Sequence, residues 1–197
     1  METKSKILLI IAALMIMLTF VFPLWYIDLE APQYPEGIGL EIWINQIVGQ
    51  NPHDLANING LNHYIGMKEI EPESIPELKI MPYLMIFMML FGLMAGILGK
   101  RTLVYTWILL FIIMAAIGMY DFYMWEYDYG HNLNPKAAIK IPGMAYQPPL
   151  IGSKMLLNFN AVSMPDISFY ILFSVVILAV IALLIDNKSK KEITTNA

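Results

Sequence analysis

The sequence contains no cysteine in its 197 residues, and only 14% of those residues are charged. The absence of cysteine excludes disulfide bonds and metal sites built on thiolates. Soluble domains have about 25% charged residues, so this chain has too little polar surface to cover a water-soluble globule. These two shortages predict a membrane protein whose polar segments are held by packing and hydrogen bonds.

The sequence also lacks the short motifs of common catalytic centres. It has no nucleophile elbow, no H-E-x-x-H pair, no phosphate loop and no dinucleotide fingerprint. It has no basic tract, which argues against nucleic acid as a partner. The apolar segments carry no ionisable residue at mid-depth, although transporters need polar groups along their path. We therefore expect a protein that is not an enzyme.

Four apolar segments are long enough to cross a hydrocarbon core, which takes about 20 helical residues. They cover residues 7–25, 81–98, 103–120 and 167–185. Together they predict a single membrane domain over residues 1–197, with long loops at 27–80 and 121–166. The first segment ends in Phe22, Trp25 and Tyr26, which are typical of the membrane interface. No small-residue cleavage site follows, so we expect a retained anchor rather than a signal peptide.

The positions of lysine and arginine predict the orientation, because these residues accumulate on the cytoplasmic side. Seven of them lie at the chain ends and in the short turn at Lys100 and Arg101. The two long loops hold five lysines against thirteen acidic residues, a net charge of −8. We therefore expect a multi-pass protein of the cell's inner (plasma) membrane, with both termini cytoplasmic and both long loops outside.

The loops contain short periodic patterns. Apolar and polar residues alternate over 40–45, as in a half-buried strand. Asp54 precedes an apolar helical period over 55–65 and is a candidate helix cap. Residues 150–164 are mixed in character and predict a segment at the interface or under the first loop. The predicted fold class is an all-α membrane protein, a four-transmembrane-helix bundle with a small mixed strand/helix extracytoplasmic cap.

The second apolar segment contains two glycines four residues apart, Gly92 and Gly96. Small residues at this spacing let another helix approach closely. The simpler interpretation is packing within this chain, because four helices need close contacts. The alternative is the interface of a homo-oligomer.

The three histidines all fall in the predicted outer loops, at His53, His63 and His131. His63 and Met67 are four residues apart, so on a helix they would share one face. Imidazole and thioether together suit copper, and soft sulfur favours Cu(I). The sequence thus predicts a candidate copper site with His63 and Met67 as the main ligands and His53 and His131 as further ligands. The alternative is ordinary surface histidine, with methionine as apolar filling.

Acidic side chains are a second candidate for cation binding. Five of them stand out in the outer loops: Glu36, Asp54, Asp121, Glu126 and Asp128. Carboxylates bind or attract hard cations, but no calcium-binding loop pattern is present. The simpler interpretation is a solvated acidic surface.

Several segments resemble a family of small bacterial four-helix membrane proteins found beside genes for nitrous oxide reductase and its copper-maturation factors. They are Phe22-Pro-Leu-Trp25, Ala31-Pro-Gln-Tyr-Pro-Glu-Gly37, Leu61-Asn-His-Tyr-Ile-Gly-Met67, Pro148-Pro-Leu-Ile-Gly152 and Leu156-Leu-Asn-Phe159. The resemblance extends from the first helix to the fourth and implies a role in copper delivery or assembly. The order of helices and loops also looks like the claudin topology, without the paired loop cysteines of that family.

Three hypotheses of function follow. The first is a non-enzymatic accessory or assembly factor that handles copper, or helps a copper enzyme mature, on the periplasmic side. The second is a small structural subunit of a larger membrane complex, with membrane or periplasmic proteins as partners. The third is a transporter or enzyme component acting through the acidic outer loops.

Overall fold

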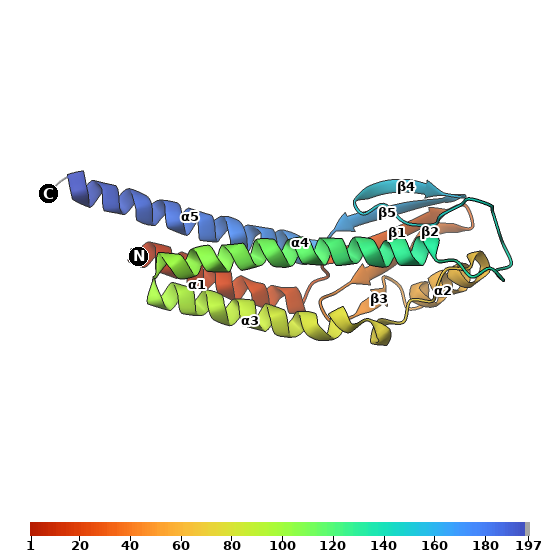
Figure 1. Ribbon diagram of the computed structural model, residues 1–197, viewed down its shortest axis with the longest axis horizontal. Coiled ribbons are helices and arrows are strands. Elements are labelled where there is room, and N and C mark those ends of the chain that lie inside the picture. The colour runs from red at the N-terminus through yellow and green to blue at the C-terminus, as the bar shows by residue number, and fades with distance from the viewer. Residues whose placement is uncertain (196–197) are drawn as a thin grey trace.

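The computed structural model describes the chain from residue 1 to residue 195, and its side chains as far as residue 188. The molecule is elongated, with a helical bundle at one end and a mixed region of strands, one helix and loops at the other (Figure 1). We call this second region the cap. It comprises the strands, helix α2 (Asp54–Ile65), the last turns of helix α4 (Arg101–His131) and the loops between them.

Four helical segments are long and apolar enough to cross a membrane, which confirms the membrane character predicted from composition. They are α1 Thr3–Met15 with the 3-10 helix η1 Ile16–Phe20, then α3 Pro76–Leu98, α4 Arg101–His131 and α5 Ile167–Thr195. Both chain ends lie at the bundle end of the molecule (Figure 1).

The turn between α3 and α4 is short, as predicted. Gly99 adopts a left-handed conformation with φ 63°, which costs a glycine little because it lacks a Cβ. Its N–H donates to the Ala95 carbonyl at 2.9 Å and ends α3. Helix α4 then begins at once, so the two helices form an antiparallel hairpin.

The two glycines of α3 serve packing inside the bundle. A Cβ on Gly92 would lie 2.3 Å from a ring carbon of Trp107, and one on Gly96 would lie 2.9 Å from Ile10. The Trp107 indole N–H also donates to the Met88 carbonyl at 2.8 Å. Helices α1 and α4 therefore cover the face of α3 that carries Gly92 and Gly96. That face is not free to pack against a second copy of the chain.

A buried carboxylate joins three helices at the bundle end. Asp186 of α5 accepts a hydrogen bond from the Glu2 backbone N–H at 2.7 Å and forms an ion pair with Arg101 of α4. The N-terminal amine donates to the Gly99 carbonyl at 3.0 Å. These bonds fix the ends of α1, α4 and α5 against one another.

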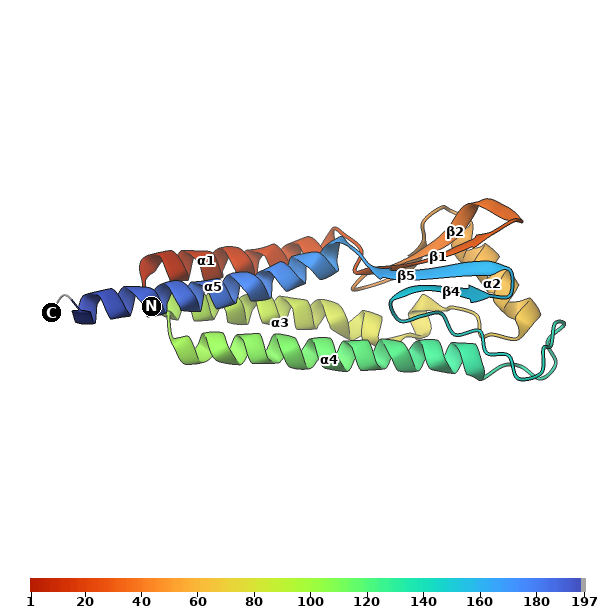
Figure 2. The ribbon, with the colours of Figure 1, turned by 90° about the horizontal axis from the view of Figure 1, so that it is seen from above.

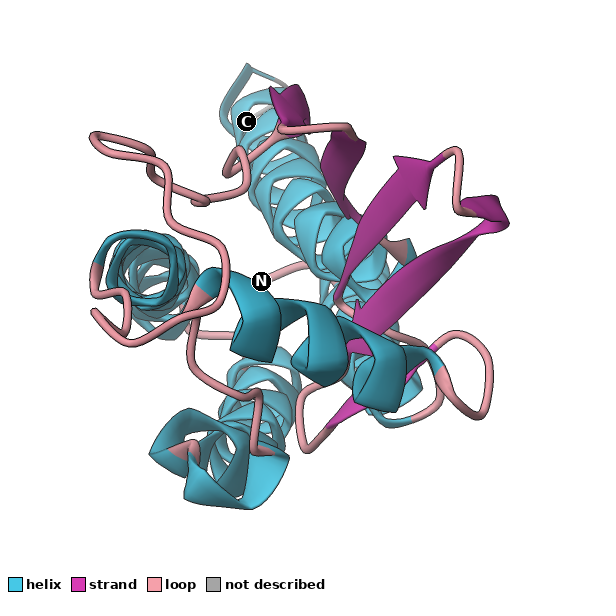
Figure 3. Ribbon diagram, turned by 90° about the vertical axis from the view of Figure 1, so that its right-hand side faces the viewer, coloured by secondary structure: helices cyan, strands magenta, loops and turns pink. Residues whose placement is uncertain are grey.

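The cap contains a five-stranded antiparallel sheet in the order β3-β2-β1-β5-β4. The strands are β1 Trp25–Ala31, β2 Tyr34–Ile42, β3 Ile47–Gly49, β4 Gly152–Leu156 and β5 Phe159–Pro165. The central pair joins the two loops, because Trp25 of β1 is opposite Pro165 of β5. The cap also contains α2 Asp54–Ile65 and the 3-10 helix η2 Pro72–Ser74. Figure 3, seen from the cap end, shows the strands on one side and the helices beside them.

The all-α fold class was therefore wrong. The chain is 58% helical and 16% strand, with one sheet built from both long loops. The alternation over 40–45 indicated a strand in the right region, but β2 is Tyr34–Ile42. The hairpin of β4 and β5 was missed because its apolar residues cluster at the turn instead of alternating. Trp25, expected to end the first helix, instead begins β1.

Helix α4 is longer than predicted and connects the bundle to the cap. It runs 31 residues to His131, about 46 Å at 1.5 Å per residue, whereas residue 120 was the expected end. Charged residues after Tyr120 suggested a loop, but the aromatic residues among them pack against the cap instead. The last turns of α4 thus lie alongside the sheet region (Figure 2).

Candidate functional site

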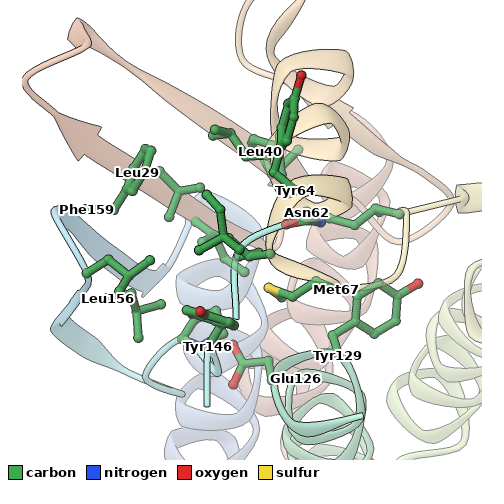
Figure 4. A pocket seen from close by; sticks show the side chains of 18 of the residues that line it. Leu29, Leu40, Asn62, Tyr64, Met67, Glu126, Tyr129, Tyr146, Leu156 and Phe159 are labelled. Carbon is green, nitrogen blue, oxygen red and sulfur yellow. The ribbon is translucent and has the colours of Figure 1, made fainter. Parts of the chain in front are cut away.

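The cap contains a cavity of about 270 Å³ that is open on one side. Its walls come from the inner face of the sheet, from α2, from the last turns of α4 and from the loop over 132–151 (Figure 4). Most of the side chains that line it are apolar, among them Leu29, Leu40, Ile58, Leu61, Leu156 and Phe159. The composition is that of a small-molecule pocket, which is mainly apolar with a few placed polar groups.

The two-residue period of the strands and the 3.6-residue period of α2 bring these side chains together. Ile27 and Leu29 of β1 are two residues apart and so point to one face of the sheet. Ile58, Leu61 and Ile65 of α2 recur at helical spacing and face the same space. The cavity is therefore the incompletely filled centre of the cap.

The loop over 132–151 closes the cavity through backbone hydrogen bonds to neighbouring elements. The Asn134 N–H donates to the Gly66 carbonyl at 2.8 Å, and the Ile139 N–H donates to the Tyr64 carbonyl at 2.9 Å. The Tyr146 N–H donates to the Gly130 carbonyl at 2.9 Å. These bonds tie the loop to the end of α2 and to the last turn of α4.

Glu126 is the unusual residue of this site. Its side chain is 1% exposed, and within the described part of the chain neither carboxyl oxygen has a hydrogen-bond partner. Figure 4 shows the carboxyl pointing into the cavity and toward Tyr146. A buried polar group without a partner costs roughly 1–3 kcal/mol. A fold that keeps such a group needs an explanation, and a ligand that completes its bonding is one.

Two more residues of the cavity wall carry a buried polar atom without a partner among the described residues, Trp125 through its indole N–H and Tyr146 through its hydroxyl. Tyr146 is 3% exposed, and its hydroxyl makes no hydrogen bond to any residue that the structure describes. Its backbone is bonded to Gly130, which lies one helical turn beyond Glu126 on the same face of α4. The tyrosine ring and the carboxyl thus occupy the same part of the cavity.

Glu126 lies in the cap, beyond the membrane-crossing part of α4. The ring of Phe122 contacts Trp25, the first residue of the sheet, with centroids 5.5 Å apart, and Glu126 is one turn further along. Burial raises the pKa of the Glu126 carboxyl from 4.5 to about 8, because removal from water disfavours the charged form. At neutral pH the group is therefore mainly protonated, and its O–H is a donor.

The cavity opens beside the turns of the two hairpins. Gln33, in the turn after β1, accepts a hydrogen bond from Asn158 in the β4–β5 turn at 2.9 Å. Leu157, which precedes Asn158, and Tyr64 of α2 line the cavity while remaining 39% and 57% exposed. Leu157 also has a φ of 58°, a left-handed conformation that is strained for a leucine. An exposed, strained apolar residue at the opening is consistent with an apolar entrance.

The structure does not gather the predicted copper ligands. His53, His63 and His131 are all exposed, and His131 stacks on Tyr127 of the same helix with ring centroids 4.0 Å apart. Over the described residues, no three His, Asp or Glu side chains lie close enough to hold a metal ion. Met67 lines the cavity, but none of the histidines does.

His63 and Met67 do not share a helical face, because α2 ends between them. The helix stops at Ile65, and Gly66 takes a left-handed conformation with φ 83°. Glycine at this position commonly terminates a helix. Met67 therefore belongs to the following segment and points into the cavity (Figure 4).

The acidic candidates have unlike environments. Asp54 does not cap α2, whose N-cap residue is His53. Its buried carboxylate instead accepts from the backbone N–H groups of Asn51 at 3.0 Å and Gly39 at 3.2 Å, and so joins α2 to β2. Asp128 is exposed and pairs with Lys68. Glu126 alone of the three is buried without a partner, which the sequence did not indicate.

No family model, curated protein or solved structure matches this chain.

Proposed function

We propose that this chain is a non-enzymatic membrane protein whose cap binds a small apolar molecule in the cavity that Glu126 lines. The observation that supports this is a mainly apolar cavity of about 270 Å³ whose wall contains a buried carboxyl without a partner among the described residues. At about 30 Å³ per water-sized group, this volume holds roughly nine such groups. A single substituted aromatic ring or a short aliphatic chain has that size.

We propose that the cap lies on the non-cytoplasmic side of the plasma membrane and that both termini lie in the cytoplasm. The support is the charge distribution, because the loops that form the cap carry a net charge of −8. Lysines and arginines concentrate at the opposite end of the bundle. A ligand would then reach the cavity from outside the cell or from the periplasm.

Binding without catalysis fits the contents of the cavity. Among the described lining residues, Glu126 is the single carboxylate, and no Lys, Arg, His, Cys, Ser or Thr accompanies it. Covalent catalysis usually needs an activated nucleophile from this set with a base beside it. Copper is a weaker candidate than an organic ligand here, because Met67 has no imidazole next to it in the cavity wall.

The test uses the full chain in lipid nanodiscs and the neutral probe 1-ethyl-4-fluorobenzene, observed by fluorine NMR. Met67→Trp places a large side chain in the cavity, whereas Met155→Trp makes the same change on a residue that is 62% exposed and outside the cavity wall. Empty nanodiscs give the signal of probe dissolved in lipid. We expect saturable binding by the wild type and by Met155→Trp, and at least tenfold weaker binding by Met67→Trp.

Two results would contradict the proposal. One is a probe signal no larger than that of empty nanodiscs. The other is equal binding by all three proteins, which would place the probe outside the cavity. Near-ultraviolet circular dichroism of each variant checks that the cap is folded.

A further inference from the structure

Two O–H groups in the cavity wall have no hydrogen-bond partner among the described residues, the carboxyl of Glu126 and the hydroxyl of Tyr146. The indole N–H of Trp125, in the same wall, is likewise without a partner there. A neutral carboxyl group and a phenol are both hydrogen-bond donors. Each unmade bond destabilises the empty cap, so a ligand that accepts both bonds gains the most from this end of the cavity.

The charge state of this end limits the ligand. Burial raises the pKa of Glu126, and no cationic side chain among the described lining residues could balance a second charge. A ligand carboxylate would have to enter as a buried, unpaired anion, which is costly. An ammonium group would have to ionise Glu126 and lose its own hydration. A neutral ligand avoids both costs.

Among neutral groups, a carbonyl oxygen matches two donors. It carries two lone pairs and has no hydrogen of its own, so both O–H groups can donate to it at once.

We propose that the ligand is a neutral apolar carbonyl compound whose oxygen accepts hydrogen bonds from Glu126 and Tyr146. This assignment rests on the proposed function, since it names the chemistry of the molecule that the cavity binds. The aromatic or aliphatic remainder of the ligand lies against Leu40, Leu61 and Leu156. Tyr64 is not part of the recognition, because its hydroxyl points away from the cavity in Figure 4.

The experiment compares 4-fluoroacetophenone with 1-ethyl-4-fluorobenzene on the full chain in nanodiscs. The two probes differ by one carbonyl oxygen in place of two hydrogens, and empty nanodiscs correct for their partition into lipid. Two neutral hydrogen bonds contribute roughly a tenfold gain in affinity. We therefore expect the ketone to bind wild-type protein about ten times more tightly than the alkyl probe.

The variants separate the two donors from the rest of the cavity. Tyr146→Phe removes one hydroxyl and should reduce the ketone preference to roughly threefold, and Glu126→Leu should do the same. Glu126→Gln keeps an N–H donor at the same place and should retain most of the preference. Tyr64→Phe is the matched control and should change nothing. The infrared carbonyl stretch of the bound ketone should shift to lower frequency in the wild type, and less in Tyr146→Phe.

The outcomes distinguish this inference from the proposed function. Equal binding of both probes by the wild type would overturn the carbonyl assignment and leave an apolar binding site. A ketone preference that survives in both Tyr146→Phe and Glu126→Leu would also overturn it. Failure of both probes to bind would remove the proposed function itself.

Discussion

Replacing Glu126 with methionine should stabilise the cap, and the gain should grow with pH. The carboxyl is 1% exposed, has no partner among the described residues, and has its pKa raised by burial from 4.5 to about 8. Above pH 4.5 the unfolded chain releases this proton, whereas the folded cap keeps it until pH 8. Raising the pH through this window therefore favours unfolding by about 1.4 kcal/mol per unit.

The magnitude follows from the width of that window. Between pH 4.5 and pH 8, the carboxyl destabilises the folded cap by up to roughly 5 kcal/mol, and above pH 8 the effect is constant. Below pH 4.5 the neutral group still lacks hydrogen bonds, which leaves a cost of about 1–3 kcal/mol. Glu126→Met removes both contributions and keeps the length of the side chain.

The assay is urea-induced unfolding of the cap of the full-length protein in detergent, followed by tryptophan fluorescence between pH 4.5 and 8.5. The difference between variant and wild type isolates Glu126 from other titrating groups. The other ionisable side chains lining the cavity are Tyr64, Tyr129 and Tyr146, and within the described chain no basic residue and no second carboxylate lines it. Parallel stability curves for the two proteins across this range would refute the reasoning, because they would mean that the carboxyl is solvated or paired.

Three further changes test other parts of the structure. Gly92→Ala should destabilise the bundle in thermal unfolding, because its Cβ would lie 2.3 Å from a tryptophan ring, while Gly118→Ala, with no atom within 4 Å, should not. Arg101→Met should cost about 3–5 kcal/mol in the same assay, because it leaves a buried carboxylate without its cation; Lys100→Met, at an exposed position, is the control. Leu157→Asn should stabilise the β4–β5 hairpin against urea by roughly 1 kcal/mol, since asparagine tolerates the left-handed φ of 58° better than leucine.

The membrane-crossing helices could be predicted from sequence because each is encoded by one continuous apolar run. The sheet could not, because its central pair joins β1 and β5, which come from two different loops. Nothing in the local pattern of either strand identifies that partner. Trp25 shows the same ambiguity, since an aromatic residue after an apolar run suits a membrane interface as well as a first strand position.

The candidate site was predictable only in part. Glu126 stood out as one acid in an aromatic stretch, but its environment depends on how the loop over 132–151 closes over it. Tyr146 lies in that loop, which has no helical or strand period, so no pattern marked it. Copper ligation was inferred from the spacing of His63 and Met67, and that spacing has its usual meaning only if the helix continues through Gly66.

The length of α4 has a mechanical consequence for the cavity. Trp125, Glu126 and Tyr129, which form one wall, belong to the same helix that enters the bundle at Arg101. Over those 25 residues the helix spans roughly 38 Å, so a tilt of about 5° moves Glu126 sideways by roughly 3 Å. Helices tilt to match bilayer thickness, and α4 is the least buried of the four spans. We therefore expect lipid composition to change the shape of the cavity through the tilt of α4.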